Sequence, residues 1–151
     1  MKKLLSIVAV SLLVTACNEP ITTSKKSPLE GNWEMVSNEI NGKKINPKRF
    51  PQQFKMLHDG FISVIMYDEA GKFYLSAAGT YDIDGNMYKE TANYHSNTNY
   101  IGFKNWEKWE MKGDTLIFYG FEKAEMADGK DVTAEMNKNG KFIEKRVRAK
   151  R

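Results

Sequence analysis

The chain has 151 residues, of which 41% are hydrophobic and 28% are charged, and its formal net charge is +4. Removal of Lys2 and Lys3 with the N-terminal leader described below lowers the 23 basic residues to 21, against 19 acidic ones, and leaves a net charge of +2. A charge this close to neutral excludes the concentrated positive field that nucleic-acid binding requires, so we expect no nucleic-acid partner.

The first residues are typical of a secretory signal peptide. Two lysines precede the apolar run Leu4 to Val14, which has the length of a signal-peptide core rather than of a membrane-spanning helix. Residues 14–17 read Val-Thr-Ala-Cys and resemble a bacterial lipobox, in which small residues fit the signal peptidase and the cysteine receives the lipid. We therefore predict a lipoprotein signal peptide over residues 1–16 and lipidation at Cys17. The alternative is a plain secretory signal beside a free thiol.

Lipidation at Cys17 predicts an exported protein of the bacterial cell envelope. We expect the N-terminal lipid to be its only membrane contact, and the outer membrane to hold it in preference to the inner one. Residues 17–28 are rich in Ser, Thr, Lys and Pro, which predicts a flexible tether. Residues 29–151 are long enough for one hydrophobic core but hardly for two. Because Cys17 is the single cysteine, this one domain must be held by its core and not by disulfides.

From Leu29 onward, short apolar runs alternate with turn signals. The turns carry Asn-Gly, Asp-Gly or related pairs, which supply the positive φ of tight hairpins, at residues 41–42, 59–60, 69–71, 84–86, 112–114, 128–129 and 139–140. The runs between them are rich in β-branched and aromatic residues and cover residues 61–67, 72–83, 86–94, 106–111, 115–121 and 141–147. This pattern predicts an all-β sandwich or barrel with little helix. Residues 121–130 contain good helix formers, but we expect strand and loop there.

The alternation within residues 73–83 predicts which face of that strand points inward. The apolar face carries Phe73, Leu75, Ala77, Gly79, Tyr81 and Ile83. Its middle is nearly bare, since Ala77 and Gly79 have little or no side chain. One interpretation of these small residues is that the strand packs closely or bends there. The other interpretation is that they border an open space inside the barrel.

The segment Gly31-Asn32-Trp33 resembles the Gly-x-Trp motif that opens the first strand of lipocalins and their calycin relatives. In those proteins the Trp closes one end of a barrel, and an Arg from the last strand packs across it. The resemblance implies that Gly31, Trp33 and either Arg146 or Arg148 close the barrel here. Such a cation-π contact is worth about 0.5 to 2 kcal/mol.

A longer resemblance links the chain to lipocalin-like lipoproteins of bacteria. It covers most of residues 29–147 and rests on six segments in the family's order: residues 54–56, 59–61, 79–81, 84–85, 88–90 and 144–146. The chain departs from the family in lacking the Trp expected between Glu144 and Arg146. The resemblance implies an antiparallel up-and-down β-barrel of about eight strands, which can enclose one small ligand. It implies no particular activity.

Basic residues crowd the end of the chain. They surround the single acidic Glu144 and comprise Lys141, Lys145, Arg146, Arg148, Lys150 and Arg151. We expect a solvated last strand and tail; contact with anionic lipid head groups is the alternative.

Catalytic and metal-binding patterns are scarce, so we predict no catalytic residues, no metal and no cofactor. The only histidines are His58, beside a turn, and His95, in a polar segment, and neither has a partner at metal-ligand spacing. No Gly-x-Ser-x-Gly elbow is present. A haem held by either histidine is conceivable in such a barrel, but no residue selects it.

Aromatic residues are the remaining functional signal, because small-molecule sites are lined mainly by apolar and aromatic side chains. We predict that the barrel binds a small apolar molecule without catalysis, at Ala77, Gly79, Tyr81, Tyr88, Trp109 and Phe118. The first alternative is a filled barrel that acts as a protein-interaction module, either an inhibitor or an envelope assembly factor. The second is an enzyme that uses His58 or His95.

Overall fold

The computed structural model describes residues 27–45 and 52–150. The predicted signal peptide, Cys17 and residues 18–26 of the predicted tether lie outside the described residues. The described strands are β1 (Gly31–Ile40), β2 (Lys43–Lys44), β3 (Gln52–His58), β4 (Phe61–Tyr67), β5 (Phe73–Asp84), β6 (Met87–His95), β7 (Lys104–Lys112), β8 (Thr115–Glu125) and β9 (Phe142–Arg148). The short helices η2 (Thr98–Tyr100) and α1 (Thr133–Met136) lie between strands. No helix in these ranges has the length and apolar character needed to span a membrane.

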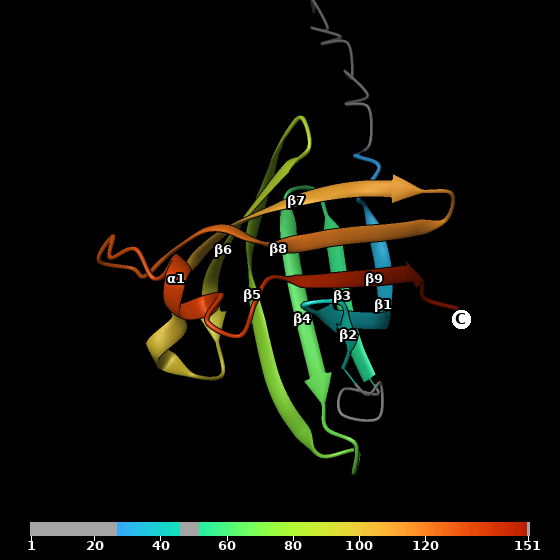
Figure 1. The fold of residues 1–151 in the computed structure, drawn as a ribbon, viewed down its shortest axis with the longest axis horizontal. Coiled ribbons are helices and arrows are strands. Elements are labelled where there is room, and N and C mark those ends of the chain that lie inside the picture. Colours follow the sequence, from blue (N-terminus) through green and yellow to red (C-terminus); the bar gives the residue numbers. More distant parts are fainter. Residues whose placement is uncertain (1–26, 46–51, 151) are drawn as a thin grey trace, which may run out of the picture.

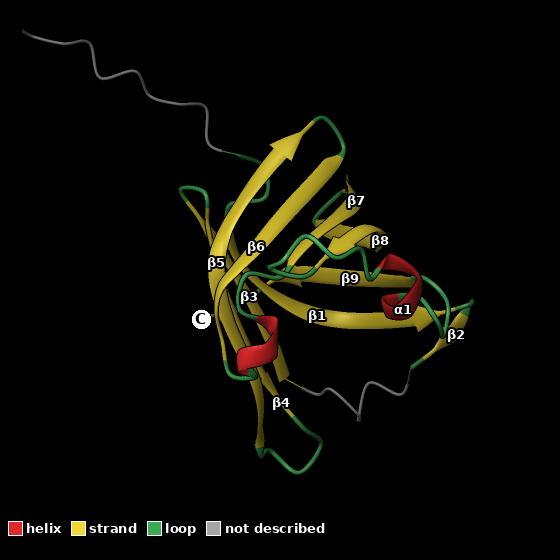
Figure 2. Ribbon diagram, turned by 90° about the vertical axis from the view of Figure 1, so that its left-hand side faces the viewer, coloured by secondary structure: helices red, strands yellow, loops and turns green. Residues whose placement is uncertain are grey.

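The strands form one antiparallel sheet that closes on itself. From β3 to β9 each strand pairs with the next along the chain, and β1 pairs with both β3 and β9. Figure 1 shows β9 alongside β1, and Figure 2 shows the curved wall from the side. Eight strands therefore make the barrel, and the two-residue β2 only adds to β1. The prediction of an all-β, antiparallel barrel of about eight strands with little helix is confirmed.

The predicted hairpin turns fall between the observed strands. Asp59 and Gly60 join β3 to β4 with φ of 47° and 77°, and Asn41 and Gly42 join β1 to β2 with φ of 51° and 72°. Positive φ at both central residues matches the right-handed twist of the paired strands, which is why Asn-Gly and Asp-Gly serve here. The expectation of strand and loop over residues 121–130 also agrees with the structure, in which β8 extends to Glu125.

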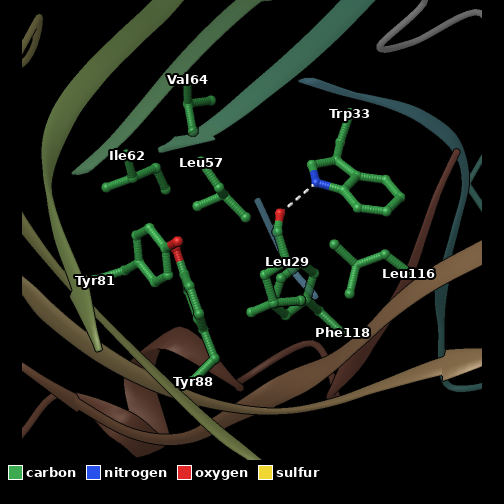
Figure 3. Close-up of a cluster of buried hydrophobic side chains, with 9 residues drawn as sticks. All are labelled: Leu29, Trp33, Leu57, Ile62, Val64, Tyr81, Tyr88, Leu116 and Phe118. Atoms are coloured by element: carbon green, nitrogen blue, oxygen red, sulfur yellow. Dashed lines mark hydrogen bonds between the residues drawn. The ribbon is translucent and has the colours of Figure 1, made fainter. Parts of the chain in front are cut away.

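The two ends of the domain meet at Trp33. The indole is buried, with 1% of its surface exposed, and its Nε1 donates a hydrogen bond to the backbone carbonyl of Leu29 at 2.7 Å (Figure 3). The guanidinium carbon of Arg148 lies 3.9 Å from the centre of the indole ring, and Trp33 pairs with Arg148 across β1 and β9. Arg148 also donates hydrogen bonds to the backbone carbonyls of Glu30 and Pro28. We call this end of the barrel the closed end.

Gly31 gives the guanidinium its space. Its φ of +136° is unfavourable for residues with a side chain, and a Cβ at this position would overlap the guanidinium of Arg148. The glycine two residues before the Trp is therefore needed for the contact between first and last strands.

A hydrophobic core fills the closed half of the barrel (Figure 3). Its fully buried side chains are Leu29, Trp33, Leu57, Tyr88, Leu116 and Phe118, with Ile62, Val64 and Tyr81 nearly as deep. A second, smaller cluster contains Ala92, Phe103, Ala124 and Val132 and lies near α1. The interior between these two clusters contains the candidate site.

Candidate functional site

A cavity of about 560 Å³ occupies the half of the barrel that lies away from Trp33. Half-buried His95, at the end of β6, and exposed Tyr74, at the start of β5, lie at its mouth. Val64 and Ala77 form part of its wall. Since Trp33 and Arg148 close the opposite end, we call the end with the mouth the open end.

Helix α1 is held against β8 at the open end. The backbone N–H of Ala124 donates to the hydroxyl of Thr133 at 2.8 Å, and the side-chain amide of Asn137 donates to the carbonyl of Phe121 at 2.8 Å. These bonds place Met136 of α1 in the cavity lining.

Aromatic side chains line the outer part of the cavity. Tyr100 and Phe103 have ring centroids 5.6 Å apart, Phe103 and Phe121 6.3 Å, and Phe121 and Phe142 5.1 Å, all edge to face. Each of the four lines the cavity, and we call them the aromatic rim. Edge-to-face packing fixes the rings without filling the space in front of them.

Five charged side chains line the inner part, and we call them the charged cluster. They come from four strands and comprise Lys55 of β3, Glu90 of β6, Glu107 of β7, and Glu144 and Arg146 of β9. Three of them, Lys55, Glu107 and Arg146, are buried. Charges removed from water in this way are costly unless they are paired or neutralised.

Four members of the charged cluster form two ion pairs. Lys55 Nζ lies 3.2 Å from Glu90 Oε2, which also accepts a hydrogen bond from the hydroxyl of Tyr88 at 2.9 Å. The guanidinium of Arg146 pairs with Glu144 and donates a second hydrogen bond to the side chain of Gln53. With 1% of its surface exposed, Arg146 is an exception to the expected solvation of the last strand.

The fifth member, Glu107, is 4% exposed, and in the described part of the chain neither a hydrogen bond nor an ion pair holds its carboxyl. Burial raises the pKa of Glu107 to about 8, opposed by the charge of nearby Lys55 and supported by Glu144 and Glu90. The carboxyl is therefore mostly protonated at pH 7. Burial and the neighbouring Glu90 also raise the pKa of Tyr88, which keeps its hydroxyl a donor.

Ala77 and Gly79, two of the three predicted ligand-binding residues on β5, have different surroundings. Ala77 lines the cavity. Gly79 does not line it, and a Cβ at this position would overlap the backbone carbonyl of Thr91 on β6. The pairing of β5 with β6 shifts register between Ala78 and Gly79, so the glycine permits a close approach of two strands at an irregularity. Both interpretations of the small residues therefore apply, each at one position: the strands pack closely at Gly79, and Ala77 borders the open cavity.

The other four predicted residues lie deeper, in the core of the closed half. The rings of Tyr81 and Tyr88 stack at 5.7 Å, and those of Tyr88 and Phe118 are 5.0 Å apart. Trp109 packs against the same cluster. The structure does not place these four side chains in the cavity lining, although Tyr88 reaches the charged cluster through Glu90. Of the barrel-closing residues, Gly31, Trp33 and Arg148 come together, whereas Arg146 points into the cavity.

Sequence reasoning missed the charged cluster. The sequence feature that could have revealed the cluster is the two-residue period of the strands, which puts residues two or four apart on the same face. Lys55 is two residues from buried Leu57, and Glu107 is two from buried Asn105 and four from buried Phe103. A charged residue that alternates in step with buried residues along a strand points to the same, inner face of the barrel.

The histidines lie at opposite ends of the barrel. His58 is exposed at the closed end, where its Nδ1 lies 3.8 Å from Asp59 and the two side chains stand close to Glu30. These three could share a cation, but exposed acidic groups cluster without one often enough that the arrangement indicates no site. His95 lines the cavity; its Nδ1 accepts a hydrogen bond from the backbone of Asn97 at 2.9 Å and its ring packs on Tyr100.

Comparisons with known proteins give little beyond this geometry. No family model matches the chain, and no curated protein matches it. A similar solved structure is that of an uncharacterised protein from Bacteroides eggerthii, with a TM-score of 0.47 and 13% identity, over 78% of this chain and 98% of that one. The closed eight-stranded antiparallel barrel is itself compatible with a lipocalin-like fold.

Proposed function

We propose that this protein is an exported, lipid-anchored member of the lipocalin-like bacterial lipoproteins, and that its barrel binds a small, largely apolar molecule without chemical turnover. The observation that carries the proposal is the cavity of about 560 Å³ inside a barrel whose other end is closed. Small-molecule sites in proteins commonly have volumes of about 300 to 1,000 Å³ and mostly apolar linings. The aromatic rim supplies such a lining beside the mouth.

The lipid anchor rests on the sequence of residues 1–17, which lie outside the described residues. The first described residues, Ser27 to Glu30, adjoin Arg148 at the closed end. A tether that leads from Cys17 to this point joins the barrel at the end opposite the cavity mouth. A ligand would then reach the cavity from the side away from the attachment point.

A matched pair of substitutions on β5 tests binding within the cavity. Ala77 lines the cavity, whereas Ala78 lines shallow depressions on the outer wall. We expect Ala77→Phe to weaken binding of the uncharged fluorescent probe N-phenyl-1-naphthylamine by about tenfold or more, equivalent to about 1.4 kcal/mol. Ala78→Phe should bind it as the unchanged protein does. Equal binding by both variants would place the probe outside the barrel and remove the support for this function.

One observation supports the alternative function, that of a protein-interaction module. Phe61 and Tyr94 are 65% and 74% exposed on the outer wall of β4 and β6, where they line one shallow depression. Exposed apolar patches often mark contact surfaces. Loss of a biological effect on Tyr94→Ser, with probe binding unchanged and Ala77→Phe harmless, would favour this alternative.

A further inference from the structure

The charged cluster contains more acidic than basic groups. Three carboxyl groups, those of Glu90, Glu107 and Glu144, face two cations, those of Lys55 and Arg146, within one cavity lining. His95 is the remaining basic side chain on the lining, and it lies at the mouth, where its Nδ1 accepts a hydrogen bond from the backbone of Asn97. The inner cavity is thus one positive charge short of balance when all its carboxyl groups are ionised.

Glu107 is the carboxyl group of the charged cluster that has no cationic partner. Each cation already has a carboxylate partner, Lys55 with Glu90 and Arg146 with Glu144. Glu107 is buried and, within the described residues, has neither a hydrogen bond nor an ion pair. A buried polar group without a partner is rare in proteins and calls for an explanation at a ligand site.

We propose that the cavity binds a small molecule with a protonated amine, whose ammonium group pairs with Glu107 while its apolar part lies against the aromatic rim. The proposal rests on the proposed function, since it names the class of molecule that the cavity takes. An ammonium donates hydrogen bonds and carries the one charge that the cluster lacks.

A ligand carboxylate fits the same surroundings less well. One free donor for it is Nη1 of Arg146, which has no hydrogen-bond partner among the described residues but is buried. A ligand anion would also join three carboxyl groups whose two cations are already paired. An uncharged head group would leave Glu107 protonated and would form no ion pair with it.

Binding of an amine is expected to release a proton. Burial raises the pKa of Glu107 to about 8, so its carboxyl is protonated at neutral pH, and the proton passes to solvent when the ammonium arrives. The charged and titratable groups that act on Glu107 are those of Lys55 on β3, Tyr88 and Glu90 on β6, and Glu144 and Arg146 on β9. Below pH 8 the affinity for an amine should therefore rise about tenfold per pH unit and then level off. An anion that needs protonated Glu107 would show the opposite trend.

Three probes with one hydrocarbon tail test the inference: octylamine, 1-octanol and octanoate. In calorimetric titrations of the purified protein at pH 8, we expect octylamine to bind at least about tenfold more tightly than octanol. Its advantage should shrink at pH 6, and titrations in buffers of different ionisation enthalpy should detect the released proton. Glu107→Gln should bring the affinity for octylamine to within about threefold of the affinity that the same variant has for octanol. Glu110→Gln is the matched control on β7, since Glu110 bonds to Lys112 and Tyr119 instead.

The outcomes separate this inference from the proposed function. Equal affinity for octylamine and octanol, or tightest binding of octanoate, overturns the amine inference and leaves the cavity a binding site. Binding of none of the three probes overturns the proposed function and the inference together. The pH trend is measured on the unchanged protein, so it decides the question even if Glu107→Gln fails to fold.

Discussion

The guanidinium of Arg148 lies 3.9 Å above the indole of Trp33, and this contact joins the last strand of the barrel to the first. The two residues are also partners in the pairing of β1 with β9. Backbone pairing and ring contact therefore close the sheet at the same place. The contact accounts for the spacing of Gly31 and Trp33, because the guanidinium occupies the space that a side chain at position 31 would need.

Replacement of Trp33 by Ala should cause a large loss of stability. A fully buried aromatic residue deleted from a core costs about 3 to 5 kcal/mol. Trp106 offers a control on β7, since it is half-buried with two lysine amines over its ring, and its replacement by Ala should cost ~1 kcal/mol. Urea unfolding measures both values. A loss under ~1 kcal/mol for Trp33→Ala would show that the indole closes nothing.

Gly31 and Arg148 should show strong energetic coupling. Gly31→Ala places a methyl group against the guanidinium and forces a disfavoured φ, whereas Arg148→Ala removes the guanidinium and leaves only the φ cost. We expect the double variant to be more stable than the sum of the single losses predicts, by about 1 kcal/mol. A double-mutant cycle from urea unfolding measures this. Additive losses would mean that the two residues do not share the space.

The fold could be predicted from the sequence because its signals are local. Hairpin turns such as Asp59-Gly60 and the strand of residues 61–67 follow from neighbouring residues alone, and Gly31-Asn32-Trp33 indicated the closure. Which arginine closes the barrel depends on the register of the last strand against the first. Arg148 and Arg146 are two residues apart on the same face, and only the register of β9 against β1 sets Arg148 on the indole.

The interior of the barrel was harder to predict. Tyr81, Tyr88 and Phe118 have the composition of a ligand site, yet they fill the closed half, because cavity depth depends on how four or more strands converge. The charged cluster joins β3, β6, β7 and β9, and no spacing within the chain relates Lys55 to Glu90 or Arg146 to Gln53.

The ion pair of Lys55 with Glu90 should be costly to break on one side. Lys55→Met leaves Glu90 in the cavity with only the hydroxyl of Tyr88 as a donor, and we expect a loss of about 3 kcal/mol. The double variant Lys55→Met, Glu90→Gln should recover most of this loss, because no uncompensated charge remains. Thermal unfolding of both variants at pH 7 gives the comparison. Failure of the second substitution to restore stability would show that Lys55 acts through packing on Tyr88 and Phe118 instead.

Replacement of Cys17 by Ser should release the protein from membranes. The thioether to the lipid requires the cysteine sulfur, so the variant has no acceptor. Cell fractionation and metabolic labelling with a fatty acid measure the result, with Ser27→Ala as a control outside the lipobox. Continued recovery of Cys17→Ser in the membrane fraction, or unlabelled unchanged protein, would contradict the anchor.

The pKa of Glu107 gives the stability of the protein a defined pH dependence. An ordinary glutamate has a pKa of 4.5, and in the folded protein burial raises it to about 8. Between these values the folded state binds more protons than the unfolded chain, so this group lowers stability as the pH rises from about 4.5 to about 8 and changes nothing outside that window. The glutamine of the Glu107→Gln variant cannot ionise, so the variant does not lose stability in this window.

We therefore expect the free energy of unfolding of Glu107→Gln to rise relative to that of the unchanged protein across the window. The difference should be on the order of 4 kcal/mol larger at pH 9 than at pH 4, whereas Glu110→Gln should show no such increase. Urea unfolding at several pH values measures the difference, and parallel curves for Glu107→Gln and the unchanged protein would mean that Glu107 is ionised in the fold.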